Sequence, residues 1–301
     1  MSQKTIHTVD GLRGFIDISK VKLRALIDML KLRLSLLVAL SSVFGYAMAV
    51  EGPHSWFMLS MIGIGGLMVT GASNVLNQMI EREYDAQMIR THQRPLPSGR
   101  LNMMEAFLYA AFLAVGGITI IGTFFNLPAA LLSIIGLLMY AFVYTPMKRV
   151  SPASVFVGAI PGALPPLIGW VAFTGQLDTG GLILFAFQFF WQFPHFWAIA
   201  WMLDEDYQKA GFKMLPSVKG KTRFSAAIIL AYTLCLIPLA WFPFQIELIN
   251  LWGTAALLVF GVLFVLPALL LYHTLDKKHA KRLMFGSFLY LPFIQLAFLL
   301  G

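Results

Sequence analysis

The sequence has little charge and almost no cysteine for a chain of 301 residues. Aspartate, glutamate, lysine and arginine make up only 12% of it, against 58% hydrophobic residues, whereas a soluble globular domain carries about a quarter charged residues. This shortage excludes an ordinary soluble protein. The single cysteine, Cys235, lies in an apolar run, so the chain has no disulfide framework and we expect a buried, inert thiol.

Long hydrophobic runs are what the sequence has in abundance. A run of about 20 apolar residues is long enough to cross a bilayer as an α-helix, and nine such runs can be placed. They cover residues 33–50, 55–76, 106–125, 128–145, 154–173, 181–201, 225–244, 251–272 and 284–300. The predicted fold is therefore an all-α integral membrane protein with nine transmembrane helices in one bundle.

The basic residues are distributed on one side of this arrangement. All 22 lysine and arginine residues precede or open the first span or fall in every second loop, and the alternate loops have none. Positively charged loops stay on the cytoplasmic side of a membrane. The sequence therefore predicts a cytoplasmic N-terminus, an external C-terminus and polar chemistry that faces the cytoplasm. The net charge of +8 comes from basic residues whose one-sided distribution is explained by membrane orientation. No nucleic-acid partner is therefore expected.

The chain is expected to form one membrane domain preceded by a short segment. Residues 1–32 are basic and amphipathic, but they include Asp10, Asp17 and Asp28 and show no cleavage site. We therefore expect a cytoplasmic, interfacial helix there rather than a signal or transit peptide, which favours the cell (plasma or inner) membrane as the location. Residues 33–301 are predicted to form the nine-helix domain that holds the activity.

The stretch GASNVLNQMIEREYDAQMIRTHQRPLPSG, residues 71–99, ends the second span in polar residues. Each residue of an α-helix turns by about 100°, so Asn77, Glu81 and Asp85, spaced four apart, fall on one stripe, and Glu83 falls on the far side. Oxygen ligands of this kind suit Mg²⁺, which keeps several waters and binds substrate phosphates. The spacing predicts a metal site. The alternative is a solvated helix end with acids paired to nearby arginines.

Basic residues close to this stripe could supply the other half of a diphosphate site. Arg90 and Arg94 follow it in the sequence, and guanidinium groups bind phosphate oxygens in bidentate fashion. Arg90 can contribute only if the chain bends after the stripe. Lys148 and Arg149 end the fourth span, with Tyr144 one helical turn before. Membrane topology alone is the alternative explanation for this basic pair.

The sixth span holds a second polar set. Asp204, Glu205 and Asp206 lie at its cytoplasmic end, where they can approach the stripe, and Gln192 and His195 lie deeper in the apolar run. Ionisable residues within a membrane span are costly and usually functional. His195 could be a hydrogen-bonded core residue, an iron ligand or a proton carrier.

Four blocks of the sequence together resemble a known family. They are N-x3-E-x3-D-x2-M-x-R-T-x2-R-P-L-P from Asn77, Y-x3-K-R from Tyr144, PGALPPLIGW from Pro161, and WQFPHFWA from Trp191 with EDYQKAGFKMLP shortly after it. From about Lys31 to the C-terminus the chain resembles the protohaem IX farnesyltransferase (haem O synthase) branch of the UbiA-type intramembrane prenyltransferases. The RTxxRPLP and PHFWA…EDYxxAG blocks are typical of the haem branch, whereas the spaced acidic motif marks only the superfamily.

The resemblance implies transfer of the farnesyl group of farnesyl diphosphate to a vinyl group of haem b, with addition of water, giving haem O for terminal oxidases. The implied metal is Mg²⁺, with Mn²⁺ as a substitute, and the implied partners are membrane lipids and a haem-modifying or oxidase-assembly protein. The implied metal ligands are Asn77, Glu81, Asp85, Glu205 and Asp206. The implied diphosphate ligands are Arg90, Arg94, Tyr144, Lys148 and Arg149, with Gln192 and His195 on the haem side. The implied catalytic set is Asn77, Glu81, Asp85, Lys148 and Asp206.

The chain departs from the superfamily pattern in two places, and two other functions stay open. Glu81 stands where aspartate is usual, and the second acidic motif has no D-x3-D spacing, so the sequence does not decide which of Asp204, Glu205 and Asp206 binds metal. One alternative is a sister prenyltransferase that acts on an aromatic quinone precursor or a chlorophyllide. Another is a transporter or channel, although His195 is the one ionisable group placed well away from the membrane rim.

Overall fold

The computed structural model describes residues 19–301. Every regular element in this range is a helix, and the range contains no strand. Most of the predicted interfacial segment, residues 1–18, lies outside the described residues, and residues 19–30 are helical. Within the described range, nine helical segments are long and apolar enough to cross a membrane. The predicted all-α fold with nine spans is confirmed.

Seven spans are single helices, and two are made of shorter pieces. The single helices are α2 (Leu32–Ala49), α3 (Trp56–Ile80), α5 (Met103–Phe124), α8 (Ser154–Thr174), α9 (Thr179–Lys209), α13 (Leu251–Thr274) and α14 (Lys277–Leu300). The fourth span joins α6 (Leu127–Leu138), the π-helical η1 (Met139–Tyr144) and α7 (Thr145–Val150), and the seventh joins α10 (Arg223–Leu234), α11 (Leu236–Leu239) and α12 (Phe242–Gln245). A short helix, α4 (Arg82–Asp85), follows α3.

Several spans reach further than predicted at their charged ends, and α9 and α14 do so by the most. Helix α9 continues to Lys209 instead of ending near residue 201, and α14 begins at Lys277 instead of near residue 284. Glutamate, glutamine and lysine are good helix formers, so the helices continue after the apolar run has ended. The extension puts the whole second acidic cluster on a regular helix.

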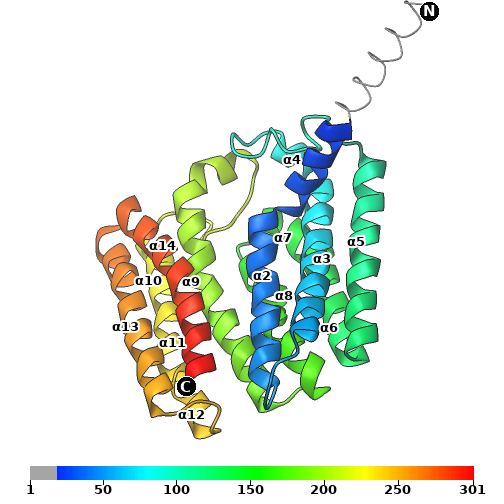
Figure 1. Cartoon of the computed structure of the whole chain (residues 1–301). Helices are drawn as coiled ribbons and strands as arrows, with labels where there is room; N and C mark the ends of the chain where they lie inside the picture. Colours follow the sequence, from blue (N-terminus) through cyan, green and yellow to red (C-terminus); the bar gives the residue numbers. More distant parts are fainter. Residues whose placement is uncertain (1–18) are drawn as a thin grey trace, which may run out of the picture.

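The spans stand side by side in one bundle with two halves (Figure 1). Helices α2, α3, α5, α6 and α8 form one half, and α9, α10, α13 and α14 form the other. The short α4 lies at one end of the bundle and the C-terminus at the opposite end (Figure 1). We call the first of these the α4 end. Because the spans alternate in direction, all the loops that contain lysine or arginine lie at the α4 end.

Helix α8 is deeply buried and packs backbone to backbone against α2. A Cβ atom at Gly169 would lie 1.9 Å from the carbonyl oxygen of Ser42, and one at Gly45 would lie 1.9 Å from that of Pro166. Only glycine permits such an approach at these two positions. This contact fixes α2 in the middle of the bundle, and with it the residues that lead into α2 at the α4 end.

Candidate active site at the α4 end

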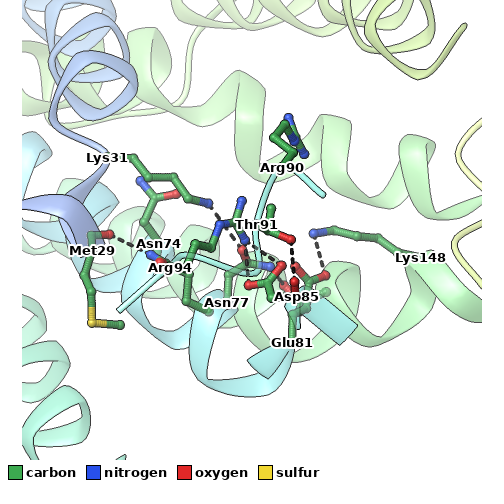
Figure 2. Close-up of polar contacts among 12 residues, drawn as sticks. Met29, Lys31, Asn74, Asn77, Glu81, Asp85, Arg90, Thr91, Arg94 and Lys148 are labelled. Atoms are coloured by element: carbon green, nitrogen blue, oxygen red, sulfur yellow. Dashed lines mark hydrogen bonds and ion pairs between the residues drawn. The ribbon is translucent and has the colours of Figure 1, made fainter. Parts of the chain in front are cut away.

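The polar stripe predicted from the sequence lies at the end of α3 and in α4 (Figure 2). Helix α3 ends just before Glu81, but the backbone N–H of Glu81 still donates to the carbonyl oxygen of Asn77 (2.9 Å), and that of Asp85 to Glu81 (2.8 Å). The four-residue helical spacing therefore continues through the break. Asn77, Glu81 and Asp85 are all buried, whereas the side chain of Glu83 is 79% exposed. The structure thus places the three residues on one inward face.

Both carboxylates of the stripe are paired with cations. Nη1 of Arg94 donates to both oxygens of Asp85, at 2.8 and 2.7 Å, and Nζ of Lys148 donates to Oε1 of Glu81 at 2.8 Å. Arg94 reaches back because the chain turns after α4, where the hydroxyl of Thr91 donates to the carbonyl oxygen of Asp85 (2.8 Å). Burial raises the pKa of Asp85 above its usual range, and the positive charge of Arg94 opposes that rise.

A third cation, Lys31, approaches the stripe and was not predicted as a site residue. Its Nζ lies 3.5 Å from Oδ1 of Asn77 (Figure 2), and Nδ2 of Asn77 donates to the hydroxyl of Thr145 (3.1 Å). Burial, followed by the positive charges of Arg94 and Lys148, lowers the pKa of Lys31 to about 7. The stripe and its three cations therefore form one compact charged cluster.

Amide side chains of α3 hold the chain segment around Lys31 in place. Nδ2 of Asn74 donates to the hydroxyl of Ser35 (3.0 Å), and Nε2 of Gln78 donates to the carbonyl oxygen of Met29 (2.8 Å). Lys31 itself has φ 48°, a left-handed conformation that separates the helical residues 19–30 from α2. In the sequence it is one of many lysines beside a membrane span, so no local signal distinguishes it.

The fourth span brings Tyr144, Lys148 and Arg149 to the same end of the bundle. Nζ of Lys148 lies 4.6 Å from the ring centroid of Tyr144, and the guanidinium of Arg149 lies 4.0 Å from that of Tyr84, distances that suit cation–π attraction. A pocket of about 240 Å³ opens beside them. It is lined by Ile80, Glu81, Tyr84, Thr145, Pro146, Arg149, Val150 and Phe212. Arg149 and Glu81 thus share one pocket.

The turn that follows α4 contacts the end of α9. Nη2 of Arg90 lies 3.4 Å from the hydroxyl of Tyr207, and the backbone N–H of Ile89 donates to Oδ1 of Asp206 (3.1 Å). Figure 2 shows Arg90 apart from the dashed contacts of the stripe. The bend that the sequence required for Arg90 is present, and it brings Arg90 against α9 rather than against the stripe.

The other two acids of the second cluster face away from the stripe. The side chain of Glu205 is 87% exposed and lies 3.8 Å from Nζ of Lys221. Oδ2 of Asp204 accepts from Nε2 of Gln208 (3.1 Å) and lies 3.9 Å from the same lysine. The structure therefore brings Asp206 to the turn after α4, but it does not bring Glu205 there, and metal binding by Glu205 stays a prediction.

His195 and Gln192, deeper in α9, face different neighbours. Nε2 of Gln192 donates to the carbonyl oxygen of Ala159 on α8 (2.7 Å). Nδ1 of His195 lies 2.7 Å from the hydroxyl of Ser287 on α14, and its ring stacks on Trp191 with centroids 4.9 Å apart. Both residues are buried. The two predicted haem-side residues lie nearly one turn apart on α9 and contact different helices, and their role stays a prediction.

Residues 38–291 match the family described as the UbiA prenyltransferase family. The chain belongs to this family. The protoheme IX farnesyltransferase of Cytophaga hutchinsonii is 46% identical over 277 residues, which cover 92% of this chain and 97% of that protein. The protoheme IX farnesyltransferase of Koribacter versatilis is 34% identical over 284 residues, which cover 90% and 91%.

Solved structures of UbiA-type proteins share this fold. A structure of digeranylgeranylglyceryl phosphate synthase has a TM-score of 0.78 at 20% identity and covers 93% of this chain and 98% of that one. A UbiA homologue from Archaeoglobus fulgidus, bound to DMAPP and Mg²⁺, has a TM-score of 0.69 at 14% identity and covers 91% and 98%. At these identities the likeness concerns the fold alone.

The oxygen atoms of the stripe fit a hard divalent cation for which the protein supplies only some of the ligands. Asn77, Glu81 and Asp85 offer one amide oxygen and two carboxylates on one buried face. Within residues 19–301, no group of three or more histidine, cysteine, aspartate or glutamate side chains is placed to hold a metal. Magnesium needs no such cage, because waters and substrate phosphates complete its coordination. The stripe therefore fits a metal that is bound together with a diphosphate.

Proposed function

We propose that this prenyltransferase transfers the farnesyl group of farnesyl diphosphate to a vinyl group of haem b, with addition of water, to give haem O and diphosphate. The observation that supports the donor half is the buried cluster of two carboxylates and one amide against three cations at the α4 end. The acceptor half is supported by relatives up to 46% identical over nearly their whole length, which are protoheme IX farnesyltransferases.

The acidic and basic residues of the charged cluster would have different roles in binding the diphosphate. Asn77, Glu81 and Asp85 would hold a Mg²⁺ or Mn²⁺ ion, which supplies positive charge to the leaving diphosphate. Arg94 and Lys148 neutralise these carboxylates in the structure. Once the carboxylates serve the metal, the same two side chains can donate to phosphate oxygens, where charge develops as the carbon–oxygen bond breaks.

The outer residues of the cluster complete the proposed diphosphate site. Lys31 adds a positive charge beside the stripe, and Tyr144 holds Lys148 by a cation–π contact. Arg149 reaches the pocket beside the stripe. Of the second acidic motif, Asp206 would contribute, and its hydrogen bond with the turn that follows α4 supports this choice.

The apolar bundle beneath the cluster suits the allylic cation that bond cleavage produces. Such a cation is quenched by water, so the reacting carbon needs a dry cavity. Aromatic side chains of α9 and α10 pack below the α4 end, with the ring of Tyr232 centred 4.5 Å from Phe193 and 5.3 Å from Trp197. The positive-inside rule puts the α4 end in the cytoplasm, so we assign residues 33–301 as the transferase domain, with its diphosphate site facing the cytoplasm.

Acceptor specificity tests this proposal. Purified protein in detergent is supplied with farnesyl diphosphate and Mg²⁺, and diphosphate release is measured with haem b, an aromatic quinone precursor or a chlorophyllide as acceptor. The proposal predicts release with haem b alone. Release that depends on another acceptor would keep the donor site and reject the haem assignment. Ion flux in proteoliposomes without any diphosphate release would favour a transporter.

A further inference from the structure

Helix α9 ends in a glycine cap that turns the chain toward α7. Gly211 has φ 71°. Its backbone N–H donates to the carbonyl oxygen of Gln208 (3.0 Å), and that of Phe212 donates to Tyr207 (2.9 Å). This pair of bonds around a left-handed glycine is the Schellman motif, which frequently brings an apolar contact between the two outer residues. The rings of Phe212 and Tyr207 make that contact, with centroids 6.1 Å apart.

Lys213, the next residue, closes the carboxyl end of α7. Its backbone N–H donates to the carbonyl oxygen of Lys148 (2.8 Å), and its Nζ donates to that of Val150 (3.3 Å). The last carbonyl groups of a helix have no partner within the helix, and a lysine side chain can bind them. One residue of the loop after α9 therefore holds the carbonyl groups on either side of Arg149.

The segment 211–213 also supports the side chain of Arg149. The guanidinium lies 4.0 Å from the ring centroid of Tyr84, and Phe212 meets that ring edge-on, with centroids 6.3 Å apart and an interplanar angle of 73°. A Cβ atom at Gly211 would lie 3.7 Å from Nε of Arg149, which is an ordinary van der Waals distance. The segment thus contacts both the backbone around Arg149 and the aromatic ring on which its guanidinium lies.

Arg149, unlike its neighbour Lys148, has no acidic partner in the described part of the chain. Lys148 is paired with Glu81, whereas Arg149 forms no ion pair within residues 19–301. Arg149 nevertheless lines the same pocket as Glu81 and Phe212. A guanidinium that is held by neutral groups in this pocket keeps its charge and its N–H donors available for a phosphate oxygen.

We infer that Phe212 and Lys213 are positioning residues, which hold the guanidinium of Arg149 in the pocket beside Glu81 so that it binds a phosphate oxygen of the substrate. This inference rests on the proposed function and deepens it, because it gives the loop after α9 a role in binding farnesyl diphosphate. Both residues act through Arg149. Their removal should therefore weaken diphosphate binding and leave the haem side unchanged.

The chain offers a matched control for each of the two residues. Phe298 on α14 is buried like Phe212 and also has two edge-on aromatic neighbours, with centroids at 5.2 and 6.3 Å. It lies close to the C-terminus, at the opposite end of the bundle (Figure 1). Lys219 is an exposed lysine of the same loop as Lys213. Phe298→Leu therefore removes the same kind of packing as Phe212→Leu, and Lys219→Met removes the same charge as Lys213→Met.

The test is isothermal titration calorimetry of inorganic diphosphate with Mg²⁺ against the purified full-length protein, because this probe reports the donor site without haem. Phe212→Leu and Lys213→Met should each weaken binding about two- to tenfold, as expected for one aromatic contact or one hydrogen bond. The two control variants and the conservative Lys213→Arg should bind as wild type does. Unchanged affinity in Phe212→Leu and Lys213→Met, or equal losses in the controls, would overturn the inference.

A double-mutant comparison separates positioning from general support of the fold. Arg149→Met should weaken binding about tenfold or more, because a charge-assisted hydrogen bond is lost. If Phe212 and Lys213 act through Arg149, adding Phe212→Leu or Lys213→Met to Arg149→Met should cause no further loss. Losses that add in full would show that the residues act independently and would overturn the inference.

Steady-state kinetics separate this inference from the proposed function. Haem O formation by the wild-type protein tests the transferase, and in Lys213→Met the KM for farnesyl diphosphate should rise while kcat stays the same. Coupled losses of diphosphate affinity, without haem O from the wild-type protein, would reject the transferase assignment and leave the positioning role standing. Haem O formation with an unchanged KM in Lys213→Met would reject the positioning role alone.

Discussion

Replacing Asp85 with asparagine removes one charge from the stripe and keeps the shape of the side chain. Asp85 is fully buried, and both of its oxygens accept from Nη1 of Arg94 at 2.7–2.8 Å. Breaking a buried pair by removing one partner costs about 3–5 kcal/mol. Because the side chain of Arg94 is 21% exposed and can reach water, we expect a loss of stability at the lower end, about 3 kcal/mol.

The same substitution should damage catalysis more than binding of the substrates. If Asp85 holds the metal that stabilises the leaving diphosphate, its removal should lower kcat by at least about 10²-fold, the loss seen when one stabilising group is removed from a transition state. That corresponds to about 2.7 kcal/mol in the barrier. A higher Mg²⁺ concentration should restore little of it, because the ligand itself is gone.

Glu83→Gln is the matched control, since it makes the same chemical change on the same short helix. Glu83 is largely exposed and lies 4.0 Å from Arg82, and surface substitutions of this kind change stability by less than about 0.5 kcal/mol. Haem O formation at saturating substrate and the unfolding temperature in detergent are measured for both variants. Equal losses of activity in Asp85→Asn and Glu83→Gln would refute the stripe, and a full kcat in Asp85→Asn would refute the metal role.

Three further predictions follow from other contacts. Lys148→Met should raise the KM for farnesyl diphosphate about tenfold or more, because it removes a charge-assisted donor to phosphate, and steady-state kinetics would show it. The pKa of Lys31 is about 7 in the folded protein, against 10.5 when unfolded, so the unfolded chain binds more protons between pH 7 and 10. The unfolding temperature of metal-free protein should therefore rise over this pH range. In Lys31→Met this rise should be absent. Gly169→Ala would place a Cβ 1.9 Å from the Ser42 carbonyl oxygen and should cost about 3 kcal/mol. Gly122→Ala, which meets only ordinary contacts inside α5, should not lower the unfolding temperature, because alanine is the better helix former.

Hydropathy and helical periodicity are enough to predict the spans and the stripe. Each membrane-length apolar run became a span, because a bilayer leaves few other structures for such a run. Asn77, Glu81 and Asp85 stay on one face although α3 ends before Glu81, because the local backbone hydrogen bonds keep the four-residue helical spacing. These features depend on neighbours in the sequence, so the sequence alone can predict them.

Residues placed by tertiary packing could not be predicted in this way. Lys31 joins the cluster because α3 anchors the chain on both sides of it, at Met29 and Ser35, and Ser287 meets His195 from a helix 92 residues away in the sequence. The sequence also left open which acid of the α9 cluster lies close to the stripe. Adjacent helical residues point about 100° apart, and the structure brings Asp206, rather than Glu205, to the turn after α4; metal binding by either residue stays a prediction.

The most direct test of the account is the chemical product of the wild-type protein. Purified protein is incubated with haem b, farnesyl diphosphate and Mg²⁺, with and without a chelator, and the haems are analysed by mass spectrometry. The account predicts a haem that has gained one farnesyl group and one water, formed only without chelator. An unmodified haem under both conditions, in protein that remains folded and binds farnesyl diphosphate, would contradict it.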